Sequence, residues 1–349
     1  MKSNKILFYM EFPPPIHGMT YINKIIFNNL KDNQDYKFYN LNLSSSLLEI
    51  GKINYNKIMK NINLIFGAWI YFFKVNPKQI YIPLSATKFG VIRDFLVLLP
   101  SIVLNKTRIL HLHGFTYYKV YEKSKLFKVV FTLISKNSKI IVLCNKQERI
   151  TQKIMNRKSF ILFNTLQTHI QFLPKQLTNK KLKLLYISNI SKLKGILDLM
   201  KAIRNIDNVT LTIAGDIWQN KDEFFKLLED LKQKVSYIGF ANEEKKQELL
   251  KSHDIFCIPS QLEEGSPISI IEAMAYGLPI IGTNKGCIKE MIQNCGYVIE
   301  NELDSNILNI ALSDIKQNYK QYSTNARQNY EKFYIKEVFI KNLEQICAE

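Results

Sequence analysis

The stretch from Pro259 to Glu290 constrains the fold most, because it places a helix between two strands. The apolar run at 254–259 is typical of a strand and leads into an acidic loop. Ser266 and Pro267 follow, the residue types favoured at the N-cap and at the first position of a helix. A glycine at 277 and a proline at 279 end that helix, and the apolar run at 278–281 predicts a second strand. The order strand, helix, strand is typical of an α/β fold.

Two glutamates mark this stretch as a candidate site. Glu264 precedes the predicted helix, and Glu272 lies on its second turn. The first amides of a helix carry the positive end of its dipole and suit a phosphate. A diphosphate at the helix start, a sugar against Glu264 and a ribose diol against Glu272 would be chemically coherent. An acidic surface loop capping an ordinary helix is the plainer alternative, and the glutamate pair alone favours it.

The sequence of this stretch resembles the E-x7-E signature of family 4 retaining glycosyltransferases: it reads EGSPISIIE, followed by AMAYGLPII and GCIKE. The resemblance implies the GT-B fold: two Rossmann-like doubly wound domains with a cleft between them and a C-terminal helix crossing back to the first domain. It also implies a nucleotide-sugar donor, with Glu264 as a catalytic residue at the sugar and Glu272 at the ribose. The remaining donor-binding residues of this loop and helix start would be Gly265, Ser266, Pro267, Ile268 and Ser269.

The N-terminal half contributes three further candidates. The strand predicted at 5–10 runs into a loop that ends at Gly18, and a helix follows. Such a loop lets backbone amides approach phosphates in doubly wound folds, although an ordinary βα loop has the same appearance. His113 directly follows the strand predicted at 108–112, where ligands bind in open α/β sheets. The resemblance assigns Gly18 to the donor phosphates and His113 to the donor sugar, as a catalytic residue, and we assign His17 to the acceptor.

In the C-terminal half, Lys194 precedes a glycine and matches the lysine that neutralises the donor diphosphate in the family. Many members carry Gly-Arg where this chain has Ser188 and Asn189. An arginine there would be a second cation on the leaving diphosphate, whereas asparagine donates only neutral hydrogen bonds. Some relatives also carry Ser-Asn, so the departure does not indicate an inactive enzyme, and we predict donor binding by Asn189.

A length of 349 residues favours two domains. Asn164 aligns with the asparagine at which family members leave their first domain. We predict an N-terminal, acceptor-side domain at 1–165 and a donor-side domain at 166–325. The last helical stretch, 326–349, would pack back on the first domain.

The net charge of +18 lies entirely in the N-terminal half. Residues 1–165 contain 25 Lys and Arg but 7 Asp and Glu, and the remaining residues are balanced. Such a basic half fits anionic lipid headgroups, an acidic acceptor or nucleic acid. No nucleic-acid-binding motif accompanies the charge, so we do not predict a nucleic-acid partner. The apolar runs at 64–73 and 95–104 are too short to span a bilayer and are typical of buried elements, or of a surface that dips into a membrane.

No Asp-x-Asp motif and no CxxC pair occurs, so we predict neither a metal nor another cofactor. The combined prediction is a metal-independent, retaining hexosyltransferase of bacterial capsule or O-antigen biosynthesis. Its donor would be a UDP- or GDP-sugar, and its acceptor a glycan or a polyprenyl-diphosphate-linked sugar. The N-terminal apolar run is too short for a signal peptide, so we expect a cytoplasmic protein attached peripherally to the inner face of the plasma membrane. A non-catalytic GT-B partner subunit that binds nucleotide-sugar or glycan without turnover is the alternative.

Overall fold

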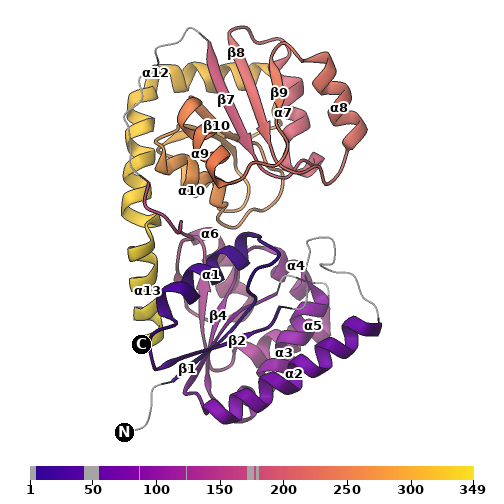
Figure 1. Ribbon diagram of the computed structural model, residues 1–349, viewed down its shortest axis with the longest axis vertical. Helices are drawn as coiled ribbons and strands as arrows, with labels where there is room; N and C mark the ends of the chain where they lie inside the picture. Colours follow the sequence, from indigo (N-terminus) through magenta and orange to yellow (C-terminus); the bar gives the residue numbers. More distant parts are fainter. Residues whose placement is uncertain (1–4, 43–54, 86, 123, 171–176, 178–180) are drawn as a thin grey trace. The chain divides into compact units, whose positions relative to one another are not determined.

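The computed structural model describes residues 5–42, 55–85, 87–122, 124–170, 177 and 181–349. The chain forms two units (Figure 1). Unit 1 comprises Met1–Gln167 together with Phe339–Glu349, and unit 2 comprises Thr168–Val338.

Unit 1 is built on a six-stranded parallel sheet with the strand order β2-β1-β3-β4-β5-β6. The strands are β1 (Ile6–Met10), β2 (Tyr36–Asn40), β3 (Gln79–Pro83), β4 (Thr107–His111), β5 (Ser138–Val142) and β6 (Ser159–Ile161). The helices are α1 (Gly18–Leu30), α2 (Tyr55–Val75), α3 (Lys88–Val103), α4 (Thr116–Glu122), α5 (Lys125–Ser135) and α6 (Asn145–Met155).

The central strands of unit 1 are apolar throughout because both faces of a parallel sheet are covered. All five residues of β1 are buried. Helices α2, α3 and α5 pack against one another in series. They enclose a core with the sheet that includes Phe72, Leu98 and Phe131. At the amino-terminal end of β4, the buried Arg108 donates hydrogen bonds to three backbone carbonyls, those of Ile134, Ser101 and Lys106.

The last helix, α13 (Lys336–Ala348), supplies the C-terminal part of unit 1. Its side chains Phe339, Leu343 and Ile346 are buried. Side chains of the sheet bind the carbonyls at the end of this helix: Gln79 Nε2 donates to Cys347 O at 2.9 Å, and Lys139 Nζ donates to Ile346 O at 2.8 Å. These bonds satisfy acceptors that the helix itself leaves open.

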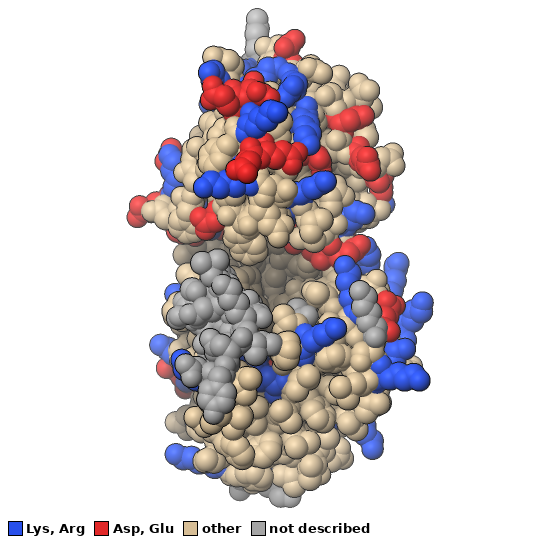
Figure 2. Space-filling view, turned by 90° about the vertical axis from the view of Figure 1, so that its right-hand side faces the viewer, with Lys and Arg blue, Asp and Glu red and all other residues tan. Residues whose placement is uncertain are grey.

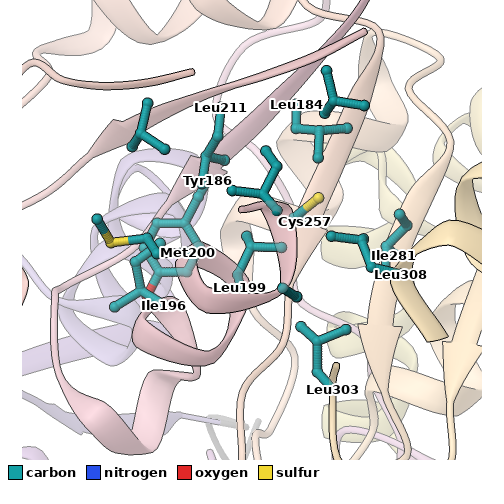
Figure 3. Packing of buried hydrophobic residues seen from close by; sticks show 14 of the residues in the cluster. Leu184, Tyr186, Ile196, Leu199, Met200, Leu211, Cys257, Ile281, Leu303 and Leu308 are labelled. Carbon is teal, nitrogen blue, oxygen red and sulfur yellow. The ribbon is translucent and has the colours of Figure 1, made fainter. Parts of the chain in front are cut away.

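Unit 2 repeats the doubly wound plan with a parallel sheet in the order β12-β11-β10-β7-β8-β9. Its strands are β7 (Leu182–Ile187), β8 (Val209–Ala214), β9 (Val235–Tyr237), β10 (Ile255–Ile258), β11 (Ile280–Thr283) and β12 (Gly296–Ile299). Its helices are α7 (Ile196–Ile203), α8 (Lys221–Asp230), α9 (Glu243–Ser252), α10 (Ile268–Ala275), α11 (Ile288–Ile292) and α12 (Ser305–Asn329). Figure 3 shows the core, in which Leu199 and Met200 of α7 lie against Tyr186 of β7 and Leu211 of β8.

Two helical patterns are each divided in the structure. The last helical stretch, predicted at 326–349, is interrupted by a π-helical turn at Tyr330–Tyr334 and by the extended residue Ile335 (φ −78°, ψ 147°). The helical apolar spacing across 117–130 is divided into α4 and α5, because Ser124 is extended (φ −151°, ψ 126°) and begins the second helix. Periodicity alone did not reveal either break, since the apolar spacing continues across both.

No helix in the described part of the chain is both long and apolar enough to cross a membrane.

Truncating Leu343 tests the contribution of α13 to unit 1. Because this side chain is fully buried, we expect Leu343→Ala to lower the free energy of unfolding by about 3 kcal/mol. The matched control is Gln345→Ala on the exposed side of the same helix, which should change it by less than about 0.5 kcal/mol. Urea denaturation followed by circular dichroism measures both. Equal effects would show that unit 1 does not depend on this contact.

Candidate functional site

An ion pair joins two residues that are 70 positions apart in the sequence of unit 2. Lys194 Nζ lies 2.7 Å from Glu264 Oε1, and the two side chains are 22% and 16% exposed. Ser260 Oγ donates a second hydrogen bond to the same carboxylate oxygen at 2.7 Å. Lys194 follows β7 and Glu264 follows β10, and these strands are neighbours in the sheet. The pair therefore lies at the carboxyl edge of the sheet, where ligands bind in open α/β folds.

Two glycines allow the segments on either side of this pair to come into backbone contact. Gly195 has φ +74°, and a Cβ there would collide with the carbonyl oxygen of Pro259. Gly286 has φ +57°, and a Cβ there would collide with the backbone of Glu264. The loop is fixed further by Gly286 N, which donates to Glu263 Oε2 at 2.7 Å. Both glycines thus hold the loop where Glu264 reaches Lys194.

Helix α10 begins later than the sequence predicts. Pro267 occupies the N-cap position with ψ 123°, and Ser266 lies before it, so the assignment of Ser266 as N-cap and Pro267 as first helical residue was wrong. The ψ of Pro267 lies outside the helical region, so the helix starts at Ile268. Gly265 and Ser266 lie in the loop, and Ser269 is the second helical residue. At the start of α10, as at any helix start, the first backbone N–H groups point out of the N-terminal end of the helix.

Glu272 lies on α10 and is buried. Its Oε1 lies 2.5 Å from Nζ of Lys246 on α9, and Lys246 also contacts Glu243 at 2.9 Å. Burial raises the pKa of Glu272 from its ordinary value, and Lys246 opposes that rise. Burial alone would lower the pKa of Lys246, but the two glutamates raise it above its ordinary range. The structure therefore holds a carboxylate inside unit 2 by supplying its own cation.

Asn189 is half-buried in the segment that follows β7. Its carbonyl oxygen accepts a hydrogen bond from the Tyr186 hydroxyl at 3.1 Å. This bond fixes the backbone between β7 and the short 3-10 turn at Lys192–Lys194.

In unit 1, His113 lies two residues beyond β4 and its ring lies against that of His111, with centroids 3.9 Å apart. The Tyr81 hydroxyl and His111 Nδ1 share a hydrogen bond of 2.6 Å. His113 Nε2 is buried without a hydrogen-bond partner among the described residues. Burial and, to a lesser extent, nearby His17 lower the pKa of His113 to about 3, so the ring is neutral at pH 7.

His17 and Gly18 lie at the start of α1, and His17 is the N-cap residue. Its backbone amide donates to Thr20 Oγ1 at 2.9 Å, and Thr20 Oγ1 donates to Pro15 O at 2.9 Å. A Cβ at Gly18 would meet nothing within 4 Å, so this glycine leaves the helix start open. Burial lowers the pKa of His17, and Glu11 partly opposes this.

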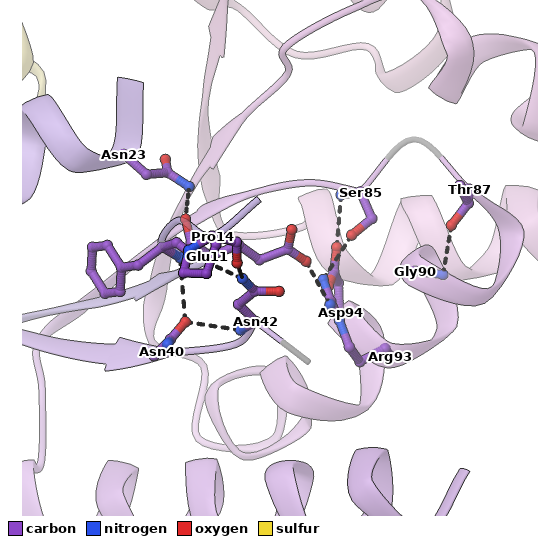
Figure 4. Close-up of polar contacts among 11 residues, drawn as sticks. Glu11, Pro14, Asn23, Asn40, Asn42, Ser85, Thr87, Gly90, Arg93 and Asp94 are labelled. Carbon is purple, nitrogen blue, oxygen red and sulfur yellow. Dashed lines mark hydrogen bonds and ion pairs between the residues drawn. The ribbon is translucent and has the colours of Figure 1, made fainter. Parts of the chain in front are cut away.

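A charged network lies at the same edge of the unit 1 sheet (Figure 4). Arg93 of α3 binds Glu11 and Asp94 at 2.7 Å each and Ser85 at 2.8 Å. Glu11 follows β1, and Ser85 follows β3 after one intervening residue. The arginine therefore ties two strand ends to the helix that covers them.

Sequence reasoning missed Lys246, Ser260 and Gly286, all of which contact the candidate glutamates or their loop. Lys246 stands in a run of lysines and glutamates (EEKKQELL) that is typical of a solvated helix. Nothing in that pattern distinguishes it from Lys245. Within the described residues, no three His, Cys, Asp or Glu side chains converge in a way that could hold a metal ion.

Residues 169–332, somewhat less than half of the chain, match the family model described as glycosyl transferases group 1. Lipopolysaccharide 1,2-N-acetylglucosaminetransferase of Salmonella typhimurium is 29% identical over 38% of this chain and 39% of that protein. The Escherichia coli UDP-Gal:alpha-D-GlcNAc-diphosphoundecaprenol alpha-1,3-galactosyltransferase is 37% identical over 22% of this chain and 20% of that protein. The alignments thus span about two fifths or less of these two relatives.

Solved structures resemble the whole chain. The lipopolysaccharide outer core galactosyltransferase WaaB in its apo form has a TM-score of 0.73, with 16% identity and 99% coverage of both chains. HepE of Anabaena, solved in complex with UDP, has a TM-score of 0.75, with 14% identity and 99% coverage of both chains. Together with the two six-stranded parallel sheets, these similarities confirm the GT-B fold.

Substituting Gly195 tests whether the close approach to Pro259 is required. Gly239 provides the control, since it has a similar φ of +73° but a Cβ there would meet nothing within 4 Å. We expect Gly239→Ala to cost about 1 kcal/mol from backbone strain, and Gly195→Ala at least ~1 kcal/mol more because a backbone atom must move. Urea unfolding of both variants measures the difference. Equal losses in the free energy of unfolding for the two variants would show that the close approach of Gly195 to Pro259 does not require glycine.

The neutral state of His113 predicts a pH dependence of stability. The unfolded chain takes up a proton on this imidazole near pH 6.5, whereas the folded protein does so only near pH 3. Stability is therefore lost as the pH falls below 6.5, by ~1–2 kcal/mol at pH 5 for this group. Between pH 6.5 and pH 5, the free energy of unfolding of His113→Gln should fall by ~1–2 kcal/mol less than that of the wild type. His169→Gln, at an exposed position, should retain the wild-type dependence, and identical profiles for all three proteins would contradict the assignment.

Proposed function

We propose that this protein is a retaining glycosyltransferase of family 4 that transfers a hexose from a nucleotide-sugar to a glycan or lipid-linked acceptor in bacterial surface polysaccharide biosynthesis. The match of residues 169–332 to glycosyl transferases group 1 supports the reaction class. The relatives' names, which include lipopolysaccharide and diphosphoundecaprenol-linked acceptors, support the biosynthetic context. The observation that carries the proposal is the pairing of Lys194 with Glu264 at the carboxyl edge of the unit 2 sheet.

Lys194 is the cation that we assign to the donor diphosphate. Glu264 holds it at this edge, so its charge lies where we propose that the diphosphate binds. The first amides of α10, near Ile268 and Ser269, add the positive end of a helix dipole. Gly265, Ser266 and Pro267 shape the backbone that leads to this helix start. Neutralisation by a lysine and helix amides would need no metal ion.

Glu264 and Glu272 receive different roles. Glu264 is half-buried and bonded to Lys194 and Ser260; we assign it to positioning the donor sugar and stabilising positive charge at the anomeric carbon. Attack from the face of the departing phosphate retains configuration without a carboxylate nucleophile. Glu272, kept as a carboxylate by Lys246, can accept hydrogen bonds from both hydroxyls of a ribose.

We assign the unit 1 residues as follows. His113 presents a neutral, buried imidazole whose Nε2 has no partner among the described residues, which suits a hydrogen bond to a hydroxyl of the donor sugar. Gly18 leaves the start of α1 open to the donor phosphates, and His17 beside it is assigned to the acceptor. Asn189, in unit 2, would donate a neutral hydrogen bond to the diphosphate.

UDP- or GDP-sugars are the donors we propose. Solved complexes of the Anabaena neighbour with UDP and with UDP-glucose make uracil the first base to try. The basic N-terminal half suits an anionic acceptor such as a polyprenyl-diphosphate-linked sugar at the inner face of the plasma membrane, with the protein attached peripherally from the cytoplasm.

A panel of UDP-, GDP-, ADP- and dTDP-sugars tests donor binding through the melting temperature. A ligand at one hundred times its dissociation constant stabilises by roughly 2.7 kcal/mol, a readable shift. One nucleotide class should stabilise the wild type, and Glu272→Gln should lose most of that shift. Glu244→Ala, an exposed substitution on α9, is the control and should keep it.

Turnover is tested separately with Glu264→Gln. Because the amide cannot stabilise positive charge as a carboxylate does, we expect donor binding to persist while transfer or hydrolysis falls by at least ~100-fold. Donor binding by the wild type without any turnover would favour the non-catalytic subunit, an interpretation prompted by Asn189 in place of arginine. A well-folded sample that binds no member of the panel would contradict the proposed function.

A further inference from the structure

The helical layer formed by α2, α3 and α5 of unit 1 carries apolar side chains on its outer face as well as on its inner face. On α2 the exposed large apolar residues are Ile58, Met59, Ile62, Phe66, Ile70 and Phe73. They recur at three-, four- and seven-residue intervals, so they form one stripe along the helix. The opposite stripe of α2, which includes Leu64, Ala68 and Phe72, is buried against the sheet. The apolar run at 64–73, expected to be buried, is thus divided between two faces.

The two neighbouring helices repeat this arrangement. Phe89, Ile92 and Val103 are exposed on α3, and Leu126, Val129 and Leu133 are exposed on α5. Each set again has the spacing of one helix face. Since α2 packs on α3 and α3 packs on α5, the three stripes lie side by side on the outside of one layer. A soluble monomer seldom exposes so many large apolar side chains on one face unless the face has a partner.

The exposed charged residues described on these three helices are all lysines. Lys60 and Lys74 of α2, Lys88 of α3, and Lys125 and Lys128 of α5 are exposed. The sequences of these helices contain a single acidic residue, Asp94, and it is buried against Arg93. Figure 2 shows one side of the molecule, on which Lys and Arg outnumber Asp and Glu over unit 1. Broad uncharged areas lie between these charged residues. The three helices therefore combine exposed apolar stripes with flanking lysines, and their described residues include no exposed acidic side chain.

We propose that the outer face of α2, α3 and α5 docks on the surface of an anionic lipid bilayer. Exposed apolar side chains would enter the boundary between headgroups and acyl chains, and the lysines would bind the headgroups, as on interfacial amphipathic helices. Long lysine side chains suit this arrangement because the aliphatic part lies along apolar surface while the ammonium group reaches the phosphates. A second copy of the chain is a poorer occupant, since a two-fold contact would bring these lysines against one another.

This docking surface deepens the peripheral attachment included in the proposed function, but it does not depend on catalysis. It would hold unit 1 where a membrane-embedded acceptor is present. Nucleotide-sugar binding should therefore be unaffected by changes on this face, which separates the two proposals experimentally.

Sedimentation with lipid vesicles tests the surface. We expect the full chain to bind vesicles of about three parts zwitterionic to one part anionic lipid, and to bind purely zwitterionic vesicles much less. Raising the salt concentration should weaken the binding because charge interactions are screened. The double variant Ile70→Ser and Phe73→Ser removes side chains that are 71% and 62% exposed, and it should lower the partition coefficient by at least ~10-fold.

The matched control is the double variant Phe225→Ser and Ile310→Ser, which removes exposed apolar side chains from unit 2 and should bind vesicles like the wild type. The triple variant Lys74→Ser, Lys88→Ser and Lys125→Ser, at exposed positions beside the apolar stripes, should lose the dependence on anionic lipid and on salt. All variants should keep the melting temperature and its response to the donor panel, which shows that they are folded. No binding of the wild type at low salt, or equal binding by the Ile70 and Phe73 variant, would overturn the proposal. A dimer in size-exclusion chromatography that the same variant dissociates, without vesicle binding, would replace the bilayer by a second copy.

Discussion

The ion pair between Lys194 and Glu264 depends on several independent features of unit 2. Both side chains are largely removed from water, where an isolated charge would be costly, so each charge is compensated by the other. Their meeting requires β7 and β10 to be parallel neighbours, and it requires glycine at 195 and at 286 so that the backbones can approach. Ser260, at the end of β10, adds a hydrogen bond to the same oxygen. Loss of any of these features would move the carboxylate relative to the lysine.

Buried ionisable groups are treated differently in the two units. In unit 2 each candidate glutamate is matched by a lysine, Glu264 by Lys194 and Glu272 by Lys246. In unit 1 burial keeps His113 neutral and lowers the pKa of His17 and of His111, which shares a hydrogen bond with Tyr81. Unit 2 thus compensates the charges of its candidate glutamates within the protein. Unit 1 combines neutral imidazoles with the compensated charges of Arg93, Glu11 and Asp94.

The strands predicted at 5–10, 108–112, 254–259 and 278–281 agree with β1, β4, β10 and β11 within one or two residues. This agreement has a physical basis, since strands buried on both faces are continuous apolar runs and helices between them are bounded by Gly, Pro and capping residues. Three helix boundaries differ from the sequence pattern. Each lies at a single residue with non-helical backbone inside or beside that pattern, namely Ser124, Ile335 and Pro267. Apolar spacing does not encode such breaks.

The sequence by itself determined the α/β class and, through the resemblance, the GT-B architecture, because these follow from the order of elements and from a motif contained in one segment. It also placed Glu264 in the loop after a strand and, through the resemblance, singled out Lys194. Only the tertiary structure showed that the two form an ion pair, that Lys246 is the partner of Glu272, and that the run at 64–73 exposes one side. The physical reason is that these facts depend on which strands and helices become neighbours. A lysine in a charged helix has the same local pattern whether its side chain reaches a buried carboxylate or water.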